Sequence, residues 1–236
     1  MNRAFIVVPI VVLLCLVLYI YCCPAPYPVR HVHDQYAVVE IHHLLSPSEC
    51  RILQQQALQH GLEPSTVVSN GIGKDDNVLA VDQRQSVQVW LPDTCCTVAQ
   101  KLANVCASLS ALPLENQEML QVVRYNPGGQ FKVHHDAYDT GDMDYVNRMN
   151  RYAGQRKCTL LVYLNDVDPG HGGETEFVGC APSFGPFRPV AGKAIFFYNT
   201  DANDGILPLS AHCGHPVLEG EKWIATKWAH PGKYAV

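Results

Sequence analysis

The stretch Phe131–Asp136 (FKVHHD) and the later stretch His212–Trp223 (HCGHPVLEGEKW) contain the residues that decide the fold and the site. His134 and Asp136 are two residues apart, so on a β-strand both side chains point to the same face. His212 can supply a third metal ligand from a distant strand. Two histidines and one carboxylate on one face of a metal leave open coordination positions, as in non-haem Fe(II) centres.

The surroundings of this pattern matter, because the chain has 11 histidines and a bare His-x-Asp with a later His arises easily by chance. Lys222 follows His212 by ten residues and can place a cation at the far end of a dicarboxylate. His135 lies between two candidate ligands and should point to the opposite face, where we interpret it as structural. Cys213 adjoins a candidate ligand and should face away from the metal for the same reason.

Length and composition predict one sizeable domain together with an N-terminal segment. The chain has 236 residues, of which 47% are hydrophobic and 17% charged, and this composition is typical of a globular protein. The formal net charge of -5 gives no support for nucleic-acid binding. Sixteen prolines and 17 glycines indicate many turns and therefore a body rich in β-structure.

The N-terminus contains an apolar segment that we expect to cross a membrane. Residues 4–23 form a nearly continuous apolar run, long enough for a helix to span a bilayer. We expect residues 1–3 to be cytoplasmic, residues 4–23 to be an uncleaved signal anchor, and residues 24–35 to be a linker. This arrangement predicts a single-pass type II protein of the endoplasmic reticulum or Golgi membrane, with its catalytic domain in the lumen. A cleaved signal peptide is the alternative.

The chain has ten cysteines, and the sequence does not determine which of them form disulfides. Three lie in or beside the apolar segment, and the remaining seven are compatible with disulfides in an oxidising lumen. Because seven is an odd number, at least one of them is free or pairs elsewhere.

Two helices and a series of short strands are expected in the remainder of the chain. Ser46, Pro47 and Glu49 have the spacing of a capping box that begins a helix ending near His60. Asp93 is expected to cap a second helix over residues 96–109. From Leu120 onward, short apolar runs alternate with turn residues, a pattern typical of a sandwich or jelly roll. The expected strands after this point are 120–125, 130–136, 158–164, 174–178, 194–198, 209–213 and 223–228.

Residues 120–230 closely resemble the catalytic domain of prolyl 4-hydroxylases, in the 2-oxoglutarate- and Fe(II)-dependent dioxygenase superfamily. Four sequence blocks carry the resemblance: Arg124–Phe131 leading into His134-x-Asp136, Arg156–Phe177 with its GGET turn, Gly192–Phe197, and His212–Trp223. The resemblance implies a mainly β fold with flanking helices around a double-stranded β-helix (jelly roll) core. We therefore expect a single catalytic domain over residues 36–236, with its core at residues 120–230.

The same resemblance implies roles for individual residues. His134, Asp136 and His212 would bind iron, and Lys222 would pair with the distal carboxylate of 2-oxoglutarate, helped by the hydroxyls of Tyr125 and Thr159. Residues on the peptide side of the iron would be His230, Trp228 and an arginine of the loop after the first ligands, Arg148 or Arg151.

The implied activity is hydroxylation of peptidyl proline to 4-hydroxyproline, with succinate and CO2 as co-products. It requires Fe(II), 2-oxoglutarate and O2, with L-ascorbate as a reductant, and it resembles that of procollagen-proline 4-dioxygenases. The partner is a proline-containing peptide or protein, and we expect no obligate partner subunit. Two alternatives stay open: a related oxygenase acting on lysine or a small molecule, and a cupin-like metal-binding module without turnover.

Overall fold

The computed structural model describes residues 29–33, 38–68, 77–78, 83–138, 153–179 and 183–234. The expected anchor at 4–23, the loop arginines Arg148 and Arg151, and Cys180 lie outside these residues. Within the described ranges, no helix combines the length and the apolar character that crossing a membrane requires. The described cysteines are all free thiols.

The largest element of the described chain is an eight-stranded sheet in which neighbouring strands run antiparallel. Its spatial order is β1 (Val29–His33), β2 (Val38–Ile41), β12 (Ala194–Tyr198), β9 (Cys158–Tyr163), β14 (Lys222–Ala229), β7 (Leu120–Tyr125), β6 (Val87–Leu91) and β3 (Glu63–Pro64). Strand β1 falls inside the stretch assigned as a linker, so that part of the linker joins the sheet by pairing with β2.

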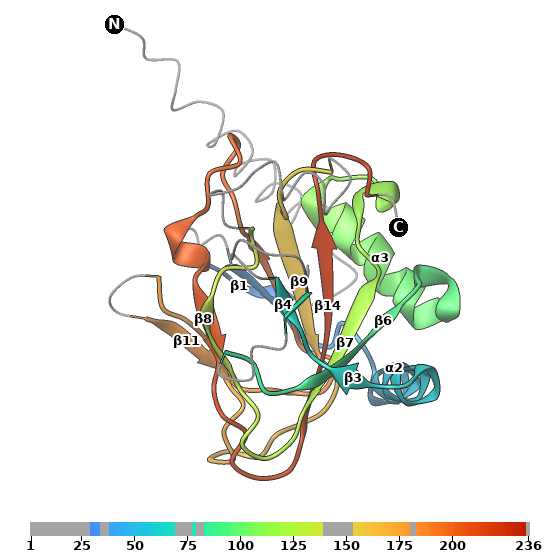
Figure 1. Cartoon of the computed structure of the whole chain (residues 1–236), viewed down its shortest axis with the longest axis vertical. Coiled ribbons are helices and arrows are strands. Elements are labelled where there is room, and N and C mark those ends of the chain that lie inside the picture. The colour runs from blue at the N-terminus through green and yellow to red at the C-terminus, as the bar shows by residue number, and fades with distance from the viewer. Residues whose placement is uncertain are drawn as a thin grey trace, which may run out of the picture.

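A second, four-stranded sheet faces the first, and its order is β11 (Phe184–Phe187), β10 (Thr175–Phe177), β13 (His212–Gly214) and β8 (Phe131–His134). A separate strand pair joins β4 (Val67–Val68) to β5 (Asn77–Val78). Two facing antiparallel sheets are the architecture of a jelly roll, so the predicted mainly β fold is confirmed. Figure 1 shows β8 and β11 on one side of the large sheet, with the helices on the other.

Helices α2 (Pro47–His60) and α3 (Thr97–Ser110) cover the outer face of the large sheet. The capping box predicted for α2 is present: Glu49 N donates to Ser46 Oγ at 3.2 Å, and Ser46 N donates to Glu49 Oε2 at 2.7 Å. The second helix is present where it was predicted, as α3, but its predicted cap residue was wrong. Asp93 belongs to a 3-10 turn (Asp93–Cys95), and Cys96 occupies the cap position of α3.

Asp93 has a different partner, the buried Lys227. The ammonium of Lys227 donates to both carboxylate oxygens of Asp93, at 2.6 and 2.8 Å. A buried ammonium is costly unless it is paired, and this pairing explains why Asp93 is not free to cap the helix.

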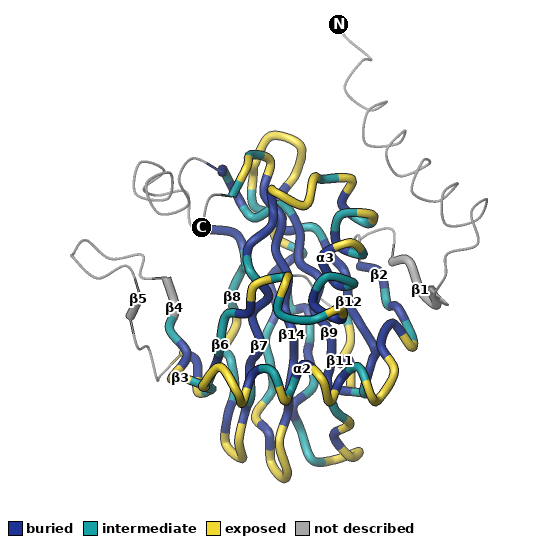
Figure 2. Tube along the Cα trace, turned by 90° about the vertical axis from the view of Figure 1, so that its right-hand side faces the viewer, coloured by how far each residue is buried: buried dark blue, intermediate teal, exposed yellow. Residues whose placement is uncertain are grey.

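Two apolar cores follow from the alternation of side chains along the central strands. On β7, Leu120 and Val122 pack against the helices, whereas Val123 and Tyr125 face the small sheet. Figure 2 shows the central strands buried and the connecting turns exposed. The second core lies between the sheets and forms the floor of the site described next.

Candidate metal and dicarboxylate site

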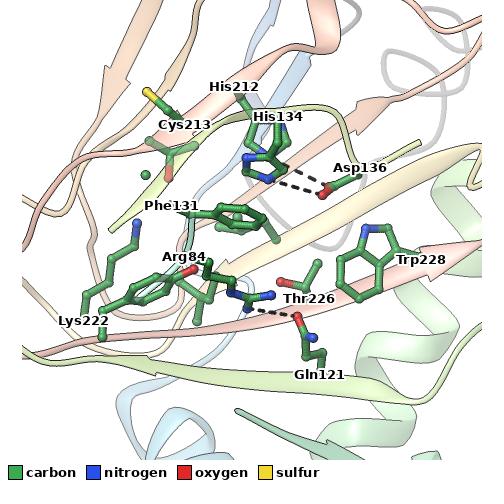
Figure 3. A pocket seen from close by; sticks show the side chains of 15 residues that line it. Arg84, Gln121, Phe131, His134, Asp136, His212, Cys213, Lys222, Thr226 and Trp228 are labelled. Carbon is green, nitrogen blue, oxygen red and sulfur yellow. Dashed lines mark hydrogen bonds and ion pairs between the residues drawn. The ribbon is translucent and has the colours of Figure 1, made fainter. Parts of the chain in front are cut away.

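The three predicted metal ligands come together between the two sheets (Figure 3). His134 ends β8 and pairs directly with His212, the first residue of β13. The strand prediction for 130–136 was too long, because Asp136 lies in a bend after β8. Its carboxylate nevertheless lies 3.6 Å from His134 Nε2 and 3.9 Å from His212 Nε2.

Backbone carbonyls orient both imidazole rings for metal binding. His134 Nδ1 lies 2.7 Å from the Lys132 carbonyl oxygen, and His212 Nδ1 lies 2.8 Å from that of Ser210. A carbonyl oxygen only accepts, so each Nδ1 carries the proton and each Nε2 keeps a lone pair toward Asp136. This arrangement of outer hydrogen bonds is the one that metal-binding histidines use.

The charge states of the group also suit a divalent metal. Burial, reinforced by the neighbouring His134, lowers the pKa of His212 to about 4, so the ring is neutral at physiological pH. Burial alone would raise the pKa of Asp136, but His212, His134 and the Thr159 hydroxyl hold it well below its usual range. Two neutral imidazoles and one carboxylate, with ligand atoms within 4.8 Å of one another, fit a divalent metal that retains open positions.

Thr159 lies at the metal end of the pocket, not at the Lys222 end where the resemblance placed it. Its hydroxyl donates to Asp136 Oδ2 at 2.7 Å and accepts from Asn199 Nδ2 at 2.9 Å. Thr159 therefore orients the carboxylate of the candidate ligand Asp136.

Replacing Thr159 with valine is expected to weaken metal binding roughly 10- to 100-fold, the usual cost of losing an outer hydrogen bond to a ligand. Thr159→Ser keeps the hydroxyl and should bind metal nearly as the wild type does. Anaerobic Fe(II) titration of the two variants measures the difference. Equal affinity in Thr159→Val and wild type would show that the hydroxyl does not orient Asp136.

Lys222 lies at the opposite end of the same pocket. It begins β14, pairs with Tyr125, and is only 3% exposed. Its ammonium lies 5.4 Å from the centre of the Tyr125 ring, and no described carboxylate forms an ion pair with it. Burial lowers the pKa of Lys222 to about 8, with Glu174 and Cys213 opposing the shift. A buried ammonium without a carboxylate partner indicates that an anionic ligand completes the site.

Thr175, on β10, was missed in the sequence. Its hydroxyl is buried, lines the pocket with Lys222 and Tyr125, and makes no hydrogen bond of normal length and angle with the described residues, although the Tyr163 hydroxyl lies near it. Buried polar groups without partners are rare in native structures, so this hydroxyl is a candidate contact for the same anion. The GGET turn that precedes β10 was the available signal, but it drew attention to Glu174.

Several other residues of the pocket wall also escaped prediction. Phe131 stacks on His134 with ring centres 3.5 Å apart, and the Arg84 guanidinium lies 4.9 Å from the Phe131 ring centre. Arg84 donates to Gln121 Oε1 at 3.4 Å, as Figure 3 shows. These side chains close one wall of the pocket between the metal end and the Lys222 end.

The two residues assigned to peptide contact differ in their surroundings. Trp228 lines the pocket, and its indole Nε1 is buried without a partner among the described residues. His230 is fully buried and does not line it: its Nε2 lies 2.9 Å from Glu118 Oε1, and its Nδ1 lies 2.9 Å from the Gly154 carbonyl oxygen. The assignment of His230 to direct substrate contact does not fit this geometry.

Glu118 forms the centre of a buried ionic group behind the pocket. It accepts from Arg156 at 2.5 and 2.9 Å, and Arg156 in turn lies 3.8 Å from the Trp228 ring centre. Burial alone would raise the pKa of Glu118, but Arg156 and His230 lower it to about 2. Glu118 therefore holds the guanidinium that supports the pocket-lining tryptophan.

Glu118→Gln is expected to reduce the free energy of unfolding by about 3–5 kcal/mol, because it leaves the Arg156 charge buried without compensation. Glu115→Gln is the matched control: Glu115 pairs with Lys233 on the surface, both side chains are more than half exposed, and the change should stay within about 0.5 kcal/mol. Urea unfolding of both variants provides the measurement. Similar midpoints would mean that the Glu118 group contributes no more than a surface pair.

Comparison with known proteins agrees with this site. The family model for the 2OG-Fe(II) oxygenase superfamily matches residues 120–230. Prolyl 4-hydroxylase 1 of Arabidopsis thaliana is 34% identical over 81% of this chain and 68% of its own length. Prolyl 4-hydroxylase subunit alpha-3 of Bos taurus is 32% identical over 86% of this chain and 36% of its own length.

A solved structure has the same fold. The viral collagen prolyl hydroxylase of Paramecium Bursaria Chlorella virus-1, in its 2OG complex, superimposes with a TM-score of 0.64 at 29% identity. The match covers 84% of this chain and 98% of the viral protein. The family model and these relatives cover the described metal and dicarboxylate site, and the chain therefore belongs to the prolyl 4-hydroxylase family of 2OG-Fe(II) oxygenases.

Proposed function

We propose that this chain hydroxylates peptidyl proline to 4-hydroxyproline, using Fe(II), O2 and 2-oxoglutarate and releasing succinate and CO2. One observation carries the proposal: a two-histidine, one-carboxylate group and a buried, unpaired Lys222 lie at the two ends of one pocket. A site that only bound a metal would not need the buried cation. Ascorbate is the reductant typical of the family.

The candidate ligands, Lys222 and the neighbouring hydroxyls have separate parts in the proposed reaction. His134, Asp136 and His212 hold Fe(II), which together with 2-oxoglutarate supplies the oxygen chemistry when both are bound. The Lys222 ammonium receives the distal carboxylate of 2-oxoglutarate, and this charge-assisted contact fixes how far the molecule reaches toward the metal. We propose that the hydroxyls of Tyr125 and Thr175, which line the same pocket, donate to this carboxylate.

The walls of the pocket exclude water from the reacting groups. Leu161 and Ile224 line it from the central strands β9 and β14, and Phe131 lines it from β8. Trp228 presents an unpaired N–H at the metal end, where a carbonyl oxygen of an extended peptide can accept it. Arg148 and Arg151, in the loop after the ligands, remain predicted substrate contacts.

The proposal is tested with the purified chain, Fe(II), ascorbate and 2-oxoglutarate. We expect succinate to form in proportion to an added proline-rich or collagen-like peptide, but not with a matched peptide in which alanine replaces each proline. Peptide-independent succinate without oxygenated proline would instead favour a related oxygenase acting on lysine or a small molecule. No turnover by the folded, iron-loaded chain would favour a binding module.

We also propose that residues 4–23 anchor the protein in the endoplasmic reticulum or Golgi membrane with residues 36–236 in the lumen. The support is the apolar composition of this stretch. Synthesis of the full chain in the presence of microsomes tests it. The chain should resist carbonate extraction and an added protease, whereas digestion of the catalytic part in intact vesicles would contradict the proposed orientation.

A further inference from the structure

A second group of metal-binding side chains lies on the outer face of the small sheet. Glu176 on β10 and Cys213 on β13 are directly paired across the two strands, and His215 lies two residues after Cys213. Alternation along each strand turns their neighbours Phe177 and His212 toward the pocket. Figure 3 shows the Cys213 sulfur pointing away from Lys222 and from the ligand group of the proposed iron site.

The three side chains of this outer cluster offer sulfur, nitrogen and oxygen ligands at close range. Their ligand atoms lie within 4.8 Å of one another, and His215 Nε2 lies 2.7 Å from Glu176 Oε2. Tetrahedral zinc, with Zn–S near 2.3 Å and Zn–N near 2.0 Å, requires separations of roughly 3.3–3.8 Å between ligand atoms. Small side-chain rotations therefore suffice, because the backbone pairing already places Glu176 opposite Cys213.

We propose that Glu176, Cys213 and His215 form a second metal site that binds Zn²⁺, with water as the fourth ligand. One thiolate, one imidazole and one carboxylate form a ligand set suited to zinc, and sulfur favours it over calcium or magnesium. The His215 side chain is 39% exposed and that of Glu176 is 20% exposed, so a metal can reach the site and keep a water.

Charge balance favours a divalent ion here. Zinc binding replaces the Cys213 S–H bond with an S–Zn bond and releases the thiol proton to solvent. The thiolate and the Glu176 carboxylate then offset the two positive charges of the ion.

The position of the cluster gives the site a structural role. Zinc would join β10 to β13 from the outer face, while His212, on the same strand as Cys213, points into the pocket. The expected effect is a stabilised small sheet around the proposed iron ligands. Cys213 also forms part of the pocket wall, but none of the three ligands belongs to the proposed iron ligand set, so the inference does not depend on the proposed hydroxylase activity.

Cobalt(II) substitution tests the site, because a thiolate bound to Co²⁺ gives an intense near-ultraviolet charge-transfer band. The proposed iron site contains no sulfur, so it cannot give this band, and the cysteine variants show which of the chain's thiols does. We expect the full-length chain to develop it with one equivalent of Co²⁺ and to lose it when Zn²⁺ is added. Cys213→Ser and His215→Ala should greatly reduce the band at the same cobalt concentration.

Two controls make the result specific. Cys95→Ser changes a thiol that is similarly half-buried, and it should keep the full band. His134→Ala should also keep it, which separates failure of this proposal from failure of the proposed iron site. A wild-type chain without the band at micromolar Co²⁺, or an equal band in Cys213→Ser, would overturn the inference.

Thermal unfolding gives an independent readout. At a hundredfold excess of Zn²⁺ over its Kd, ligand linkage raises the Tm by about 5 °C or more for a chain of this size. Measured in the His134→Ala background, the rise should disappear when His215→Ala is added. A rise of the same size in that double variant would mean that zinc acts elsewhere.

Discussion

His212→Ala is expected to lower peptide hydroxylation by more than about a hundredfold, even at saturating 2-oxoglutarate. Loss of an outer contact to a metal ligand already costs 10- to 100-fold, and this change removes a ligand itself. Asp136→Ala should be equally severe, because the carboxylate is the only anionic member of the group. The rate of 4-hydroxyproline formation is the quantity to measure.

The fold should survive this change, and that makes the result interpretable. His212 is buried, but its described hydrogen bond is a single contact to the carbonyl of Ser210. His171→Ala is the matched control: this partly exposed histidine pairs with Glu219 and lies outside the pocket. It should retain full activity. Normal turnover by a folded His212→Ala chain would show that the metal is held elsewhere.

Lys222→Met is expected to raise the KM for 2-oxoglutarate by roughly thirtyfold to a few thousandfold. Truncating one member of a buried charge pair typically costs about 2–5 kcal/mol of binding. Methionine fills a similar volume, so the loss is mainly that of the charge. Lys233→Met, at an exposed site, should leave the KM unchanged. An unchanged KM in Lys222→Met would refute the role of this ammonium.

The same residue predicts a pH dependence. Because the pKa of Lys222 is about 8 in the ligand-free chain, the ammonium is charged below pH 8 and neutral above it. The KM for 2-oxoglutarate should therefore be flat from pH 6.5 to 7.5 and rise toward tenfold per pH unit above about 8. A KM that stays flat up to pH 9.5 would contradict this assignment of the pKa.

Lys222→Met should also stabilise the protein in the absence of 2-oxoglutarate. The pKa falls from 10.5 to about 8 on folding, so folding disfavours the charged form by roughly 3 kcal/mol. That penalty is fully present below pH 8 and fades as the pH rises toward 10.5. At pH 7 the variant should have the higher Tm without ligand, and a given concentration of 2-oxoglutarate should raise the Tm of the wild type more than that of the variant.

Local sequence signals predicted those elements in which local chemistry and tertiary packing agree. The capping box at Ser46 and the strands Leu120–Tyr125 and Ala194–Tyr198 are of this kind. Asp93 failed as a cap because Lys227, 134 residues away, needs its carboxylate. Strand β11 (Phe184–Phe187) was missed because its central Gly-Pro pair resembles a turn.

In the site, too, some residues could be predicted from the sequence and others depend on the tertiary structure. The candidate ligands and Lys222 were picked out because the sequence blocks that contain them resemble those of prolyl 4-hydroxylases, and the structure brings the three candidate ligands together. The sequence did not show which end of the pocket the hydroxyls of Thr159 and Thr175 reach. That depends on how the two sheets face each other, because the two threonines lie on strands of different sheets. The outer cluster depends on cross-strand pairing of Glu176 with Cys213, which no local pattern shows.

The most direct test of the proposed function is the mass of both products after turnover under isotopically heavy O2. We predict one heavy oxygen atom in the hydroxyl of 4-hydroxyproline and one in succinate, because a dioxygenase divides O2 between its two substrates. Labelled succinate with an unmodified peptide would contradict prolyl hydroxylation, and no label in either product would contradict the oxygenase assignment itself.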